Sequence, residues 1–334
     1  MEQQNPYIKQ FHDLFEGKKI LYVHGFGSSG QSGTAKRIRE VLPNAQVVAP
    51  DLPIHPQEAL DLLHRVCQAE QPDLILGTSM GGMFAEMLYG YDRILINPAF
   101  NIADTMSEHG LTGKQQFFSP RQDGVQEFYV DKPLVKEYRT VSGQNFAHVA
   151  DEGEQQRVYG LFGDEDNLVH THDLFREHYS QAIRFHGEHR MNDRSFMHSV
   201  LPVMRWVDDR QEHRERPIIY IGIETLVDPR RQPAASAQKA VRLLTETYTV
   251  YFVAPSTSAA SSAYAVTLSW MEEYVSVPAY DRVVFTNQRH LLYGDYLIEA
   301  HETPDAMATS LLYGSDTFKT WDDIIDYFAR LGGQ

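Results

Sequence analysis

The chain has 334 residues, of which 42% are hydrophobic, and its formal net charge is −15. This length favours two domains, and the apolar content is sufficient for a buried core in each. The acidic charge argues against a nucleic acid or an anionic membrane as a partner, because both attract basic surfaces.

The chain contains a single cysteine, Cys67, so a disulfide within the chain is excluded. It lies in an apolar helical pattern, which favours a buried structural thiol over a reactive one. The polar N-terminal stretch lacks the apolar segment of a signal peptide, and no run of residues is long enough to span a membrane. We therefore expect a cytoplasmic protein.

The first quarter of the chain alternates apolar strands with helices. Strands are predicted at residues 19–23, 45–49 and 74–76, and helices at 34–42 and 56–69. Strand, helix, strand, helix, strand is typical of a parallel, doubly wound sheet.

A nucleophile elbow is predicted directly after the strand at 74–76. Gly77-Thr78-Ser79-Met80-Gly81 matches G-x-S-x-G and precedes a helical pattern. The strained turn would lift the Ser79 hydroxyl clear of the backbone, and a Cβ at either glycine would collide across the turn. We expect Ser79 to be the nucleophile. The competing interpretation is an ordinary glycine-rich turn with a capping serine.

An oxyanion hole is predicted from a second turn. His24-Gly25-Phe26-Gly27 follows the first strand, where α/β-hydrolases place one oxyanion donor. We expect the backbone N–H groups of Phe26 and Met80 to point at one oxygen and stabilise a tetrahedral intermediate. The alternative is a simple glycine turn, in which His24 is structural.

The regular alternation stops after the strand predicted at 93–99. Residues 100–156 are polar, rich in aromatic side chains and weakly periodic, with a helical patch at 133–138. An insertion of this kind often covers an active site, so we expect a partial lid over about 100–156.

The sheet resumes with a strand at 157–162, which leads into an acidic turn. Asp166 is our choice for the acid that orients the catalytic imidazole, because the order Ser, Asp, His is the hydrolase order. Asp164 and Glu165 are the alternatives. A merely solvated acidic turn is also open.

Four histidines compete for the role of general base around the strand at 182–185. His178 precedes that strand, His186 is at its end, and His198 falls in the helix at 196–207. His189 lies in the loop itself, so it is our choice, with His198 as the alternative. No H-E-x-x-H motif or cysteine pair indicates a metal, and no cofactor motif is present.

Residues from about 20 to 206 resemble the YqiA-like small esterase family within the α/β-hydrolases. The resemblance rests on the segments YVHGFGSS, APDLP, GTSMGG, INPAF, GDEDNLV and GEHRM. It implies hydrolysis of a carboxylic ester or thioester through an acyl-enzyme, with Ser79, Asp166 and His189 in the matching positions.

A dense charge run at 208–217 ends in proline and is predicted to be a linker between domains at 1–210 and 217–334. Beyond it, apolar and helical patterns predict a second, smaller Rossmann-like α/β domain. The pattern consists of a strand beginning at 218, helices at 234–244, 264–274 and 321–331, and strands at 249–253 and 282–286.

This second half resembles the haloacid dehalogenase-like phosphatases, in particular their small 5′-nucleotidase branch. IGIETLVD stands where that family has its DxDGTLVD motif, and FVAPS, SWMEEYV and RHLLYGDYLIEA match later segments. The match places Ile221 and Ile223 at the two catalytic aspartates, Thr267 at the phosphate-binding lysine and Glu299-Ala300 at the paired metal-binding carboxylates. Phosphoryl transfer needs an aspartate nucleophile and a metal, so we expect a phosphatase-dead domain kept for binding, assembly or shielding.

The leading hypothesis is therefore a serine esterase or thioesterase acting on a small-molecule acyl substrate. One alternative is a non-catalytic binding or scaffold protein in which both halves are degenerate. Another is a phosphate- or nucleotide-sensing C-terminal domain that regulates the esterase half. The sequence leaves a homodimer open.

Overall fold

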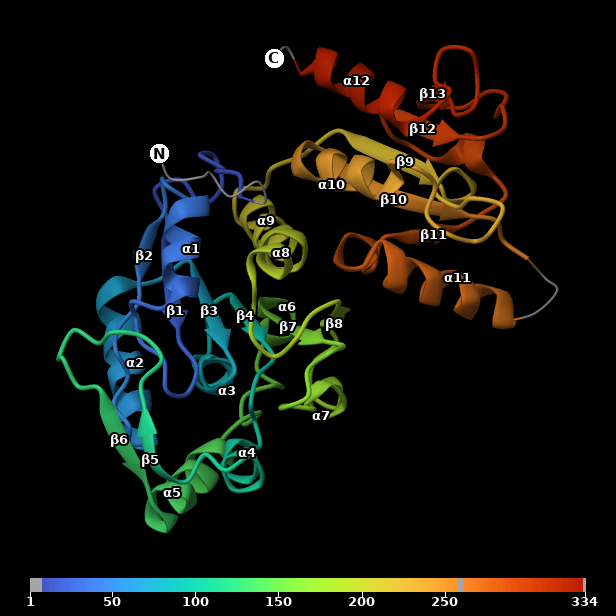
Figure 1. The fold of residues 1–334 in the computed structure, drawn as a ribbon. Helices are drawn as coiled ribbons and strands as arrows, with labels where there is room; N and C mark the ends of the chain where they lie inside the picture. The colour runs from blue at the N-terminus through green and yellow to red at the C-terminus, as the bar shows by residue number, and fades with distance from the viewer. Residues whose placement is uncertain (1–7, 258–260, 333–334) are drawn as a thin grey trace. The chain divides into compact units, whose positions relative to one another are not determined.

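The computed structural model describes residues 8–257 and 261–332. The N-terminal stretch in which we expect no signal peptide begins at residues 1–7, outside the described residues. The chain forms two compact units, Met1–Asp208 and Asp209–Gln334, called the N-terminal and C-terminal units below (Figure 1). Among the described residues, no helix is long and apolar enough to cross a membrane.

The N-terminal unit is built on a parallel six-stranded sheet, with the order β2-β1-β3-β4-β7-β8 in the described residues. Its central strands are almost entirely buried, as expected for a parallel sheet covered on both faces. The strands are β1 Lys19–Val23, β2 Gln46–Val48, β3 Leu74–Thr78, β4 Arg93–Ile96, β7 Val158–Gly163 and β8 Ala182–Phe185.

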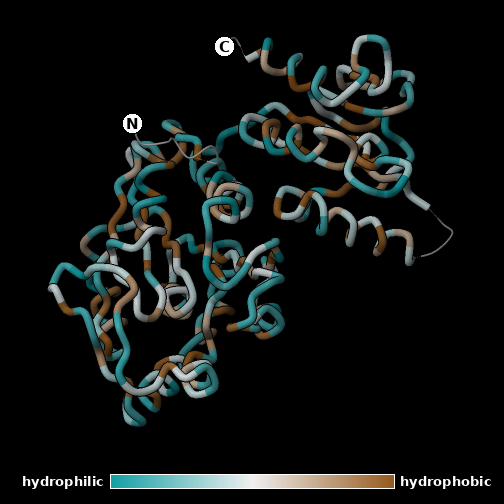
Figure 2. The backbone as a smooth tube through the Cα atoms, in the orientation of Figure 1, coloured by the Kyte–Doolittle hydropathy of each residue, from teal (hydrophilic) through white to brown (hydrophobic). Residues whose placement is uncertain are grey.

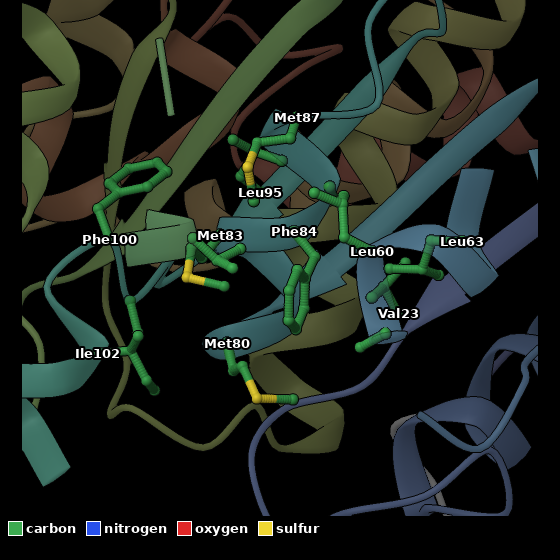
Figure 3. Close-up of a cluster of buried hydrophobic side chains, with 14 of the residues drawn as sticks. Val23, Leu60, Leu63, Met80, Met83, Phe84, Met87, Leu95, Phe100 and Ile102 are labelled. Carbon is green, nitrogen blue, oxygen red and sulfur yellow. The ribbon is translucent and has the colours of Figure 1, made fainter. Parts of the chain in front are cut away.

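Helices pack on both faces of this sheet (Figure 1). On one face, Val23 of β1 lies in a single core cluster with Leu60, Phe84 and Phe100, and Figure 3 shows Phe84 close to Leu60 and Val23. The helices of the unit are α1 Gly33–Val41, α2 Pro56–Glu70, α3 Met80–Glu86, α4 Ile102–Glu108, α5 Lys132–Ser142, α6 Glu154–Arg157, α7 His172–Arg176, α8 Asp193–Ser195, the π-helical turn η1 Phe196–Val200 and α9 Leu201–Gln211. The fold is a doubly wound α/β fold around a parallel sheet, as the alternation of strands and helices predicts.

The insertion at 100–156 has more regular structure than the sequence predicts. It contains α4, α5, α6 and an antiparallel hairpin of β5 (Gly113–Gln116) and β6 (Glu127–Val130). Its C-terminal end is anchored to the sheet by the buried guanidinium of Arg93 in β4, which donates to a Glu154 carboxylate and to the carbonyl of Glu86. The Glu86 carboxylate accepts in turn from the Tyr179 hydroxyl and the Asn145 amide.

The segment at 208–217 is not a linker throughout, since α9 continues to Gln211. Asp208 is buried and its carboxylate lies 2.7 Å from the Lys18 ammonium. The charge run at 208–217 suggests an exposed segment, because the sequence does not show that Asp208 has a partner. In the structure Lys18, far away in the sequence, neutralises this carboxylate.

The C-terminal unit has its own parallel sheet, with the order β11-β10-β9-β12-β13 among the described residues. In Figure 2, the brown colour that marks hydrophobic residues recurs along its strands. Trp321 of α12 is buried, and its indole N–H donates to the Thr225 carbonyl. β12 and β13 are short strands that the sequence pattern did not reveal. The elements are β9 Ile218–Gly222, η2 Ile223–Thr225, α10 Ala237–Thr247, β10 Thr249–Ala254, α11 Ser261–Tyr274, η3 Val277–Ala279, β11 Val283–Phe285, η4 Arg289–Leu291, β12 Tyr296–Glu299, β13 Thr309–Leu312 and α12 Trp321–Leu331.

Candidate active site

Ser79 occupies a strained turn between β3 and α3. Its φ is 56° and its ψ is −121°, a conformation that costs on the order of 1–3 kcal/mol for a residue other than glycine. A Cβ added to Gly77 would lie 2.4 Å from the carbonyl oxygen of Gly81. A Cβ added to Gly81 would lie 2.0 Å from the carbonyl oxygen of Val23. Only glycine therefore fits on either side of this serine.

Ser79, His189 and Asp166 form one hydrogen-bonded series. The Ser79 Oγ lies 3.0 Å from His189 Nε2, and His189 Nδ1 lies 2.8 Å from an Asp166 carboxylate oxygen. These distances are those required for a general base and the acid that orients it. Residues from the loops after β3, β7 and β8 thus meet at the carboxyl edge of the sheet.

The environment of Asp166 keeps its side chain ionised. Burial acts to raise the pKa of this carboxyl, but the hydrogen bond and charge of His189 and the N–H groups of Val169 and Leu168 outweigh burial, so the pKa lies below its ordinary value. A carboxylate held in this way accepts from Nδ1–H of the imidazole and leaves Nε2 free to accept the serine proton.

The other candidate residues lie elsewhere. His186 is exposed and hydrogen-bonds Asp164, which forms a second His–Asp pair next to the first. His178 stacks on Phe146 with ring centroids 4.2 Å apart, and His198 lies in η1. Of the four histidines, His189 is the one whose ring nitrogen lies within hydrogen-bond distance of Ser79.

The turn predicted to carry an oxyanion donor lies against the serine. A Cβ on Gly25 would be 3.3 Å from the Ser79 Cβ. Met80 is the first residue of α3, so its N–H has no acceptor within the helix. Among the described residues, the N–H of Phe26 donates to no backbone carbonyl. Both amides are therefore available to a ligand oxygen.

His24 holds this turn in place through hydrogen bonds to backbone groups. Its Nδ1 lies 2.9 Å from the Gly25 carbonyl oxygen, and its Nε2 accepts from the Leu52 N–H at 3.1 Å. Burial lowers the pKa of His24 to about 4, so the ring is neutral and carries its proton on Nδ1. It joins the turn at residues 24–27 to the loop after β2.

The model of the Uncharacterised protein family (UPF0227) matches residues 19–193, slightly more than half of the chain. The chain belongs to this family. Two solved structures to which it is similar are Est1E from Butyrivibrio proteoclasticus, at 16% identity over 61% of this chain and 90% of that chain with a TM-score of 0.41, and the thioesterase domain from the curacin biosynthetic pathway, at 18% identity over 59% and 92% with a TM-score of 0.36.

Asn97 lies in the INPAF segment of the UPF0227 region, and the sequence does not reveal its contacts with the loop of His189. It follows β4 with a φ of 46° and is buried. Its side-chain amide donates to the carbonyls of Glu188 and His189 at 3.1 Å each and accepts from the Gly163 N–H at 2.7 Å. One side chain therefore connects the loop of His189 to the end of β7.

The insertion of this UPF0227 protein is attached directly to the loops around Ser79. The Phe118 N–H donates to the Gly27 carbonyl at 2.7 Å, and the Ser29 hydroxyl donates to the Pro120 carbonyl at 2.6 Å. Asp51 accepts from the Gln122 N–H at 2.7 Å. The hairpin loop is thus hydrogen-bonded to the turn at residues 24–27 and to the loops that follow it, and a partial lid over about 100–156 stays a prediction.

Aromatic side chains of the insertion pack against Phe26 in this turn. The Phe26 ring packs edge-on against Phe128 and Tyr138, with centroids 5.2 and 6.1 Å away. The Tyr138 hydroxyl lies 3.3 Å from the Met80 sulfur. The side chains around Phe26 are therefore mainly apolar. No group of three or more metal-ligating side chains occurs in the described parts of the chain.

Proposed function

We propose that the N-terminal unit is a serine hydrolase that cleaves a small-molecule carboxylic ester or thioester through an acyl-enzyme on Ser79. The observation that carries the proposal is the hydrogen-bonded series from Ser79 through His189 to Asp166. Serine, histidine and carboxylate in this order activate a hydroxyl as a nucleophile.

In the proposed reaction, the Ser79 Oγ attacks the acyl carbon while its proton passes to Nε2 of His189. The negative carbonyl oxygen is bound by the N–H groups of Phe26 and Met80. As the intermediate collapses, His189 gives the proton to the departing alcohol or thiol, and the acyl group stays on Ser79. Water, deprotonated by His189, then releases the carboxylic acid and regenerates the serine.

Labelling with a fluorophosphonate probe tests this proposal, because the probe phosphonylates only an activated serine. We expect the wild type to be labelled at Ser79, and Ser79→Ala to lose both the label and the hydrolysis of 4-nitrophenyl esters. Ser107→Ala is the matched control, since that hydroxyl only bonds a carbonyl of its own helix. A folded wild type that stays unlabelled would instead favour a non-catalytic binding or scaffold protein.

For the C-terminal unit, we infer a haloacid dehalogenase-like fold without phosphatase chemistry. Ile221 is buried in the central strand β9, and Ile223 follows at the strand's carboxyl end. Neither side chain can act as a nucleophile or bind a metal, which supports a role in binding or assembly.

A cavity of about 500 Å³ favours ligand binding as a second candidate function for this unit. It opens at the carboxyl ends of β9, β10 and β12, where open parallel sheets bind ligands. Its lining residues are Ile223, Glu224, Val227, Pro255, Arg289, Glu299, His301 and Thr303. If the cavity senses phosphates or nucleotides, thermal-shift screening of the full chain with these compounds will show stabilisation that Arg289→Gln removes.

A further inference from the structure

Arg190 directly follows the proposed base, and its guanidinium lies on an aromatic ring. The guanidinium carbon is 4.8 Å from the centre of the Phe118 ring. Phe118 is bonded through its N–H to the Gly27 carbonyl, and a Cβ on Gly27 would lie only 2.9 Å from the Phe118 ring. The cation is therefore held beside the turn that carries Phe26.

Arg190 differs in its charge balance from a second arginine that stacks in the same region. Arg121 lies 4.6 Å from the centre of the Phe117 ring, but its guanidinium pairs with Asp123 at 2.9 Å and also donates to the Leu52 carbonyl. Arg190 forms no ion pair with a carboxylate in the described residues. Of these two stacked guanidiniums, Arg190 is thus the one without a neutralising partner.

Stacking on a ring restrains a guanidinium while its N–H donors remain available at the edge of the plane. Phe118 is 65% exposed, so neither the ring nor the cation above it is closed off from solvent. With a net charge of −15, the chain as a whole repels anions. A local cation next to the base would therefore decide whether an anionic substrate can bind.

We propose that Arg190, held by Phe118, binds an anionic group of the substrate, a carboxylate or a phosphate. This deepens the proposed function and rests on it: the preferred substrates are esters or thioesters that carry a negative charge near the scissile bond. The guanidinium has the two parallel donors that carboxylate and phosphate oxygens accept.

Matched substrates test this inference. A carboxylate on the acyl side is provided by mono-4-nitrophenyl glutarate, with 4-nitrophenyl valerate as its neutral counterpart. A phosphate on the leaving side is provided by the S-butyryl thioester of 2-mercaptoethyl phosphate, with the S-butyryl thioester of 2-mercaptoethanol as its neutral counterpart. The pair that shows the preference identifies which anion is bound.

We expect Arg190→Gln to lower the anionic-to-neutral ratio of kcat/KM roughly 10- to 100-fold in one pair, mainly through KM. Arg190→Lys should recover part of the ratio, and added salt should reduce it in the wild type. The matched control is Arg194→Gln, an exposed arginine four residues further on. An equal loss on anionic and neutral substrates would overturn the inference, because a residue that only fastens the insertion affects both alike.

The two proposals fail in different ways. Absence of hydrolysis and of Ser79 labelling in the wild type refutes the hydrolase. Hydrolysis at Ser79 with an anionic-to-neutral ratio that Arg190→Gln does not change refutes the anion site alone.

Discussion

Acid is expected to destabilise the N-terminal unit through His24. This buried imidazole uses both nitrogens, with Nε2 accepting from Leu52 and Nδ1 donating to Gly25. A protonated ring cannot accept a hydrogen bond, and its charge would be buried. Accordingly, burial lowers the pKa of His24 from 6.5 to about 4.

The sign of the effect follows from proton binding in the two states. Between pH 6.5 and about 4 the unfolded chain binds a proton at His24 that the folded chain does not, so stability falls as the pH falls through this window. The contribution is fully present above pH 6.5. At about 1.4 kcal/mol for each pH unit, the free energy of unfolding drops by about 3 kcal/mol by pH 4.

The measurement is urea unfolding of the full chain from pH 7.5 to 4.5. Peptide-resolved hydrogen exchange follows residues 19–24 and 50–53, so that the N-terminal unit is observed separately. In His24→Gln, which cannot titrate, this part of the pH dependence should disappear. His55→Gln is the control, because His55 is exposed and its hydrogen bond to Glu137 raises its pKa. An unchanged pH dependence in His24→Gln would refute the reasoning.

Two further predictions concern residues that act on the site or on the insertion. Asn97→Gly removes the side chain, and glycine tolerates the positive φ at this position. The loop of His189 should then lose its position, and kcat should fall ~10- to 100-fold. Asn97→Asp should keep only the hydrogen bond from the Gly163 N–H, and an unchanged kcat in both variants would contradict this role. Arg93→Met leaves the buried Glu154 carboxylate without its cation and should cost about 3–5 kcal/mol, measured by urea unfolding. The double variant with Glu154→Met should recover most of that loss, and no recovery would refute the ion-pair explanation.

The features that sequence patterns predicted are those with local causes. The elbow requires two glycines around Ser79 because both flanking Cβ positions are filled by backbone atoms, and this requirement is written within five residues. Buried strands of a parallel sheet are continuous apolar runs and are recognised without knowledge of their neighbours. The position of His189 in the loop after β8 suits a general base, and His189 is the histidine that hydrogen-bonds Ser79.

The features that were missed depend on partners far away in the sequence. The amide of Asn97 contacts carbonyls 91 and 92 residues further along the chain, and nothing in INPAF indicates that contact. Asp208 lies within α9, and its carboxylate pairs with Lys18 at a separation of 190 residues. β5 and β6 have four residues each and β5 is polar, so their alternation is too short to distinguish them from loop.

Different interactions stabilise the sheet and hold the loops around Ser79. The sheet of the N-terminal unit is held by apolar burial, whereas the loops around Ser79 are also held by polar side chains: His24 at residues 24–27, Asn97 at the loop of His189, and Asp51 together with Ser29 at the insertion. Each of these side chains contacts backbone groups of another loop. Substitutions there should therefore change the positions of catalytic groups by small distances while the sheet stays intact, and a loss of activity without a loss of the folded unit is the expected signature.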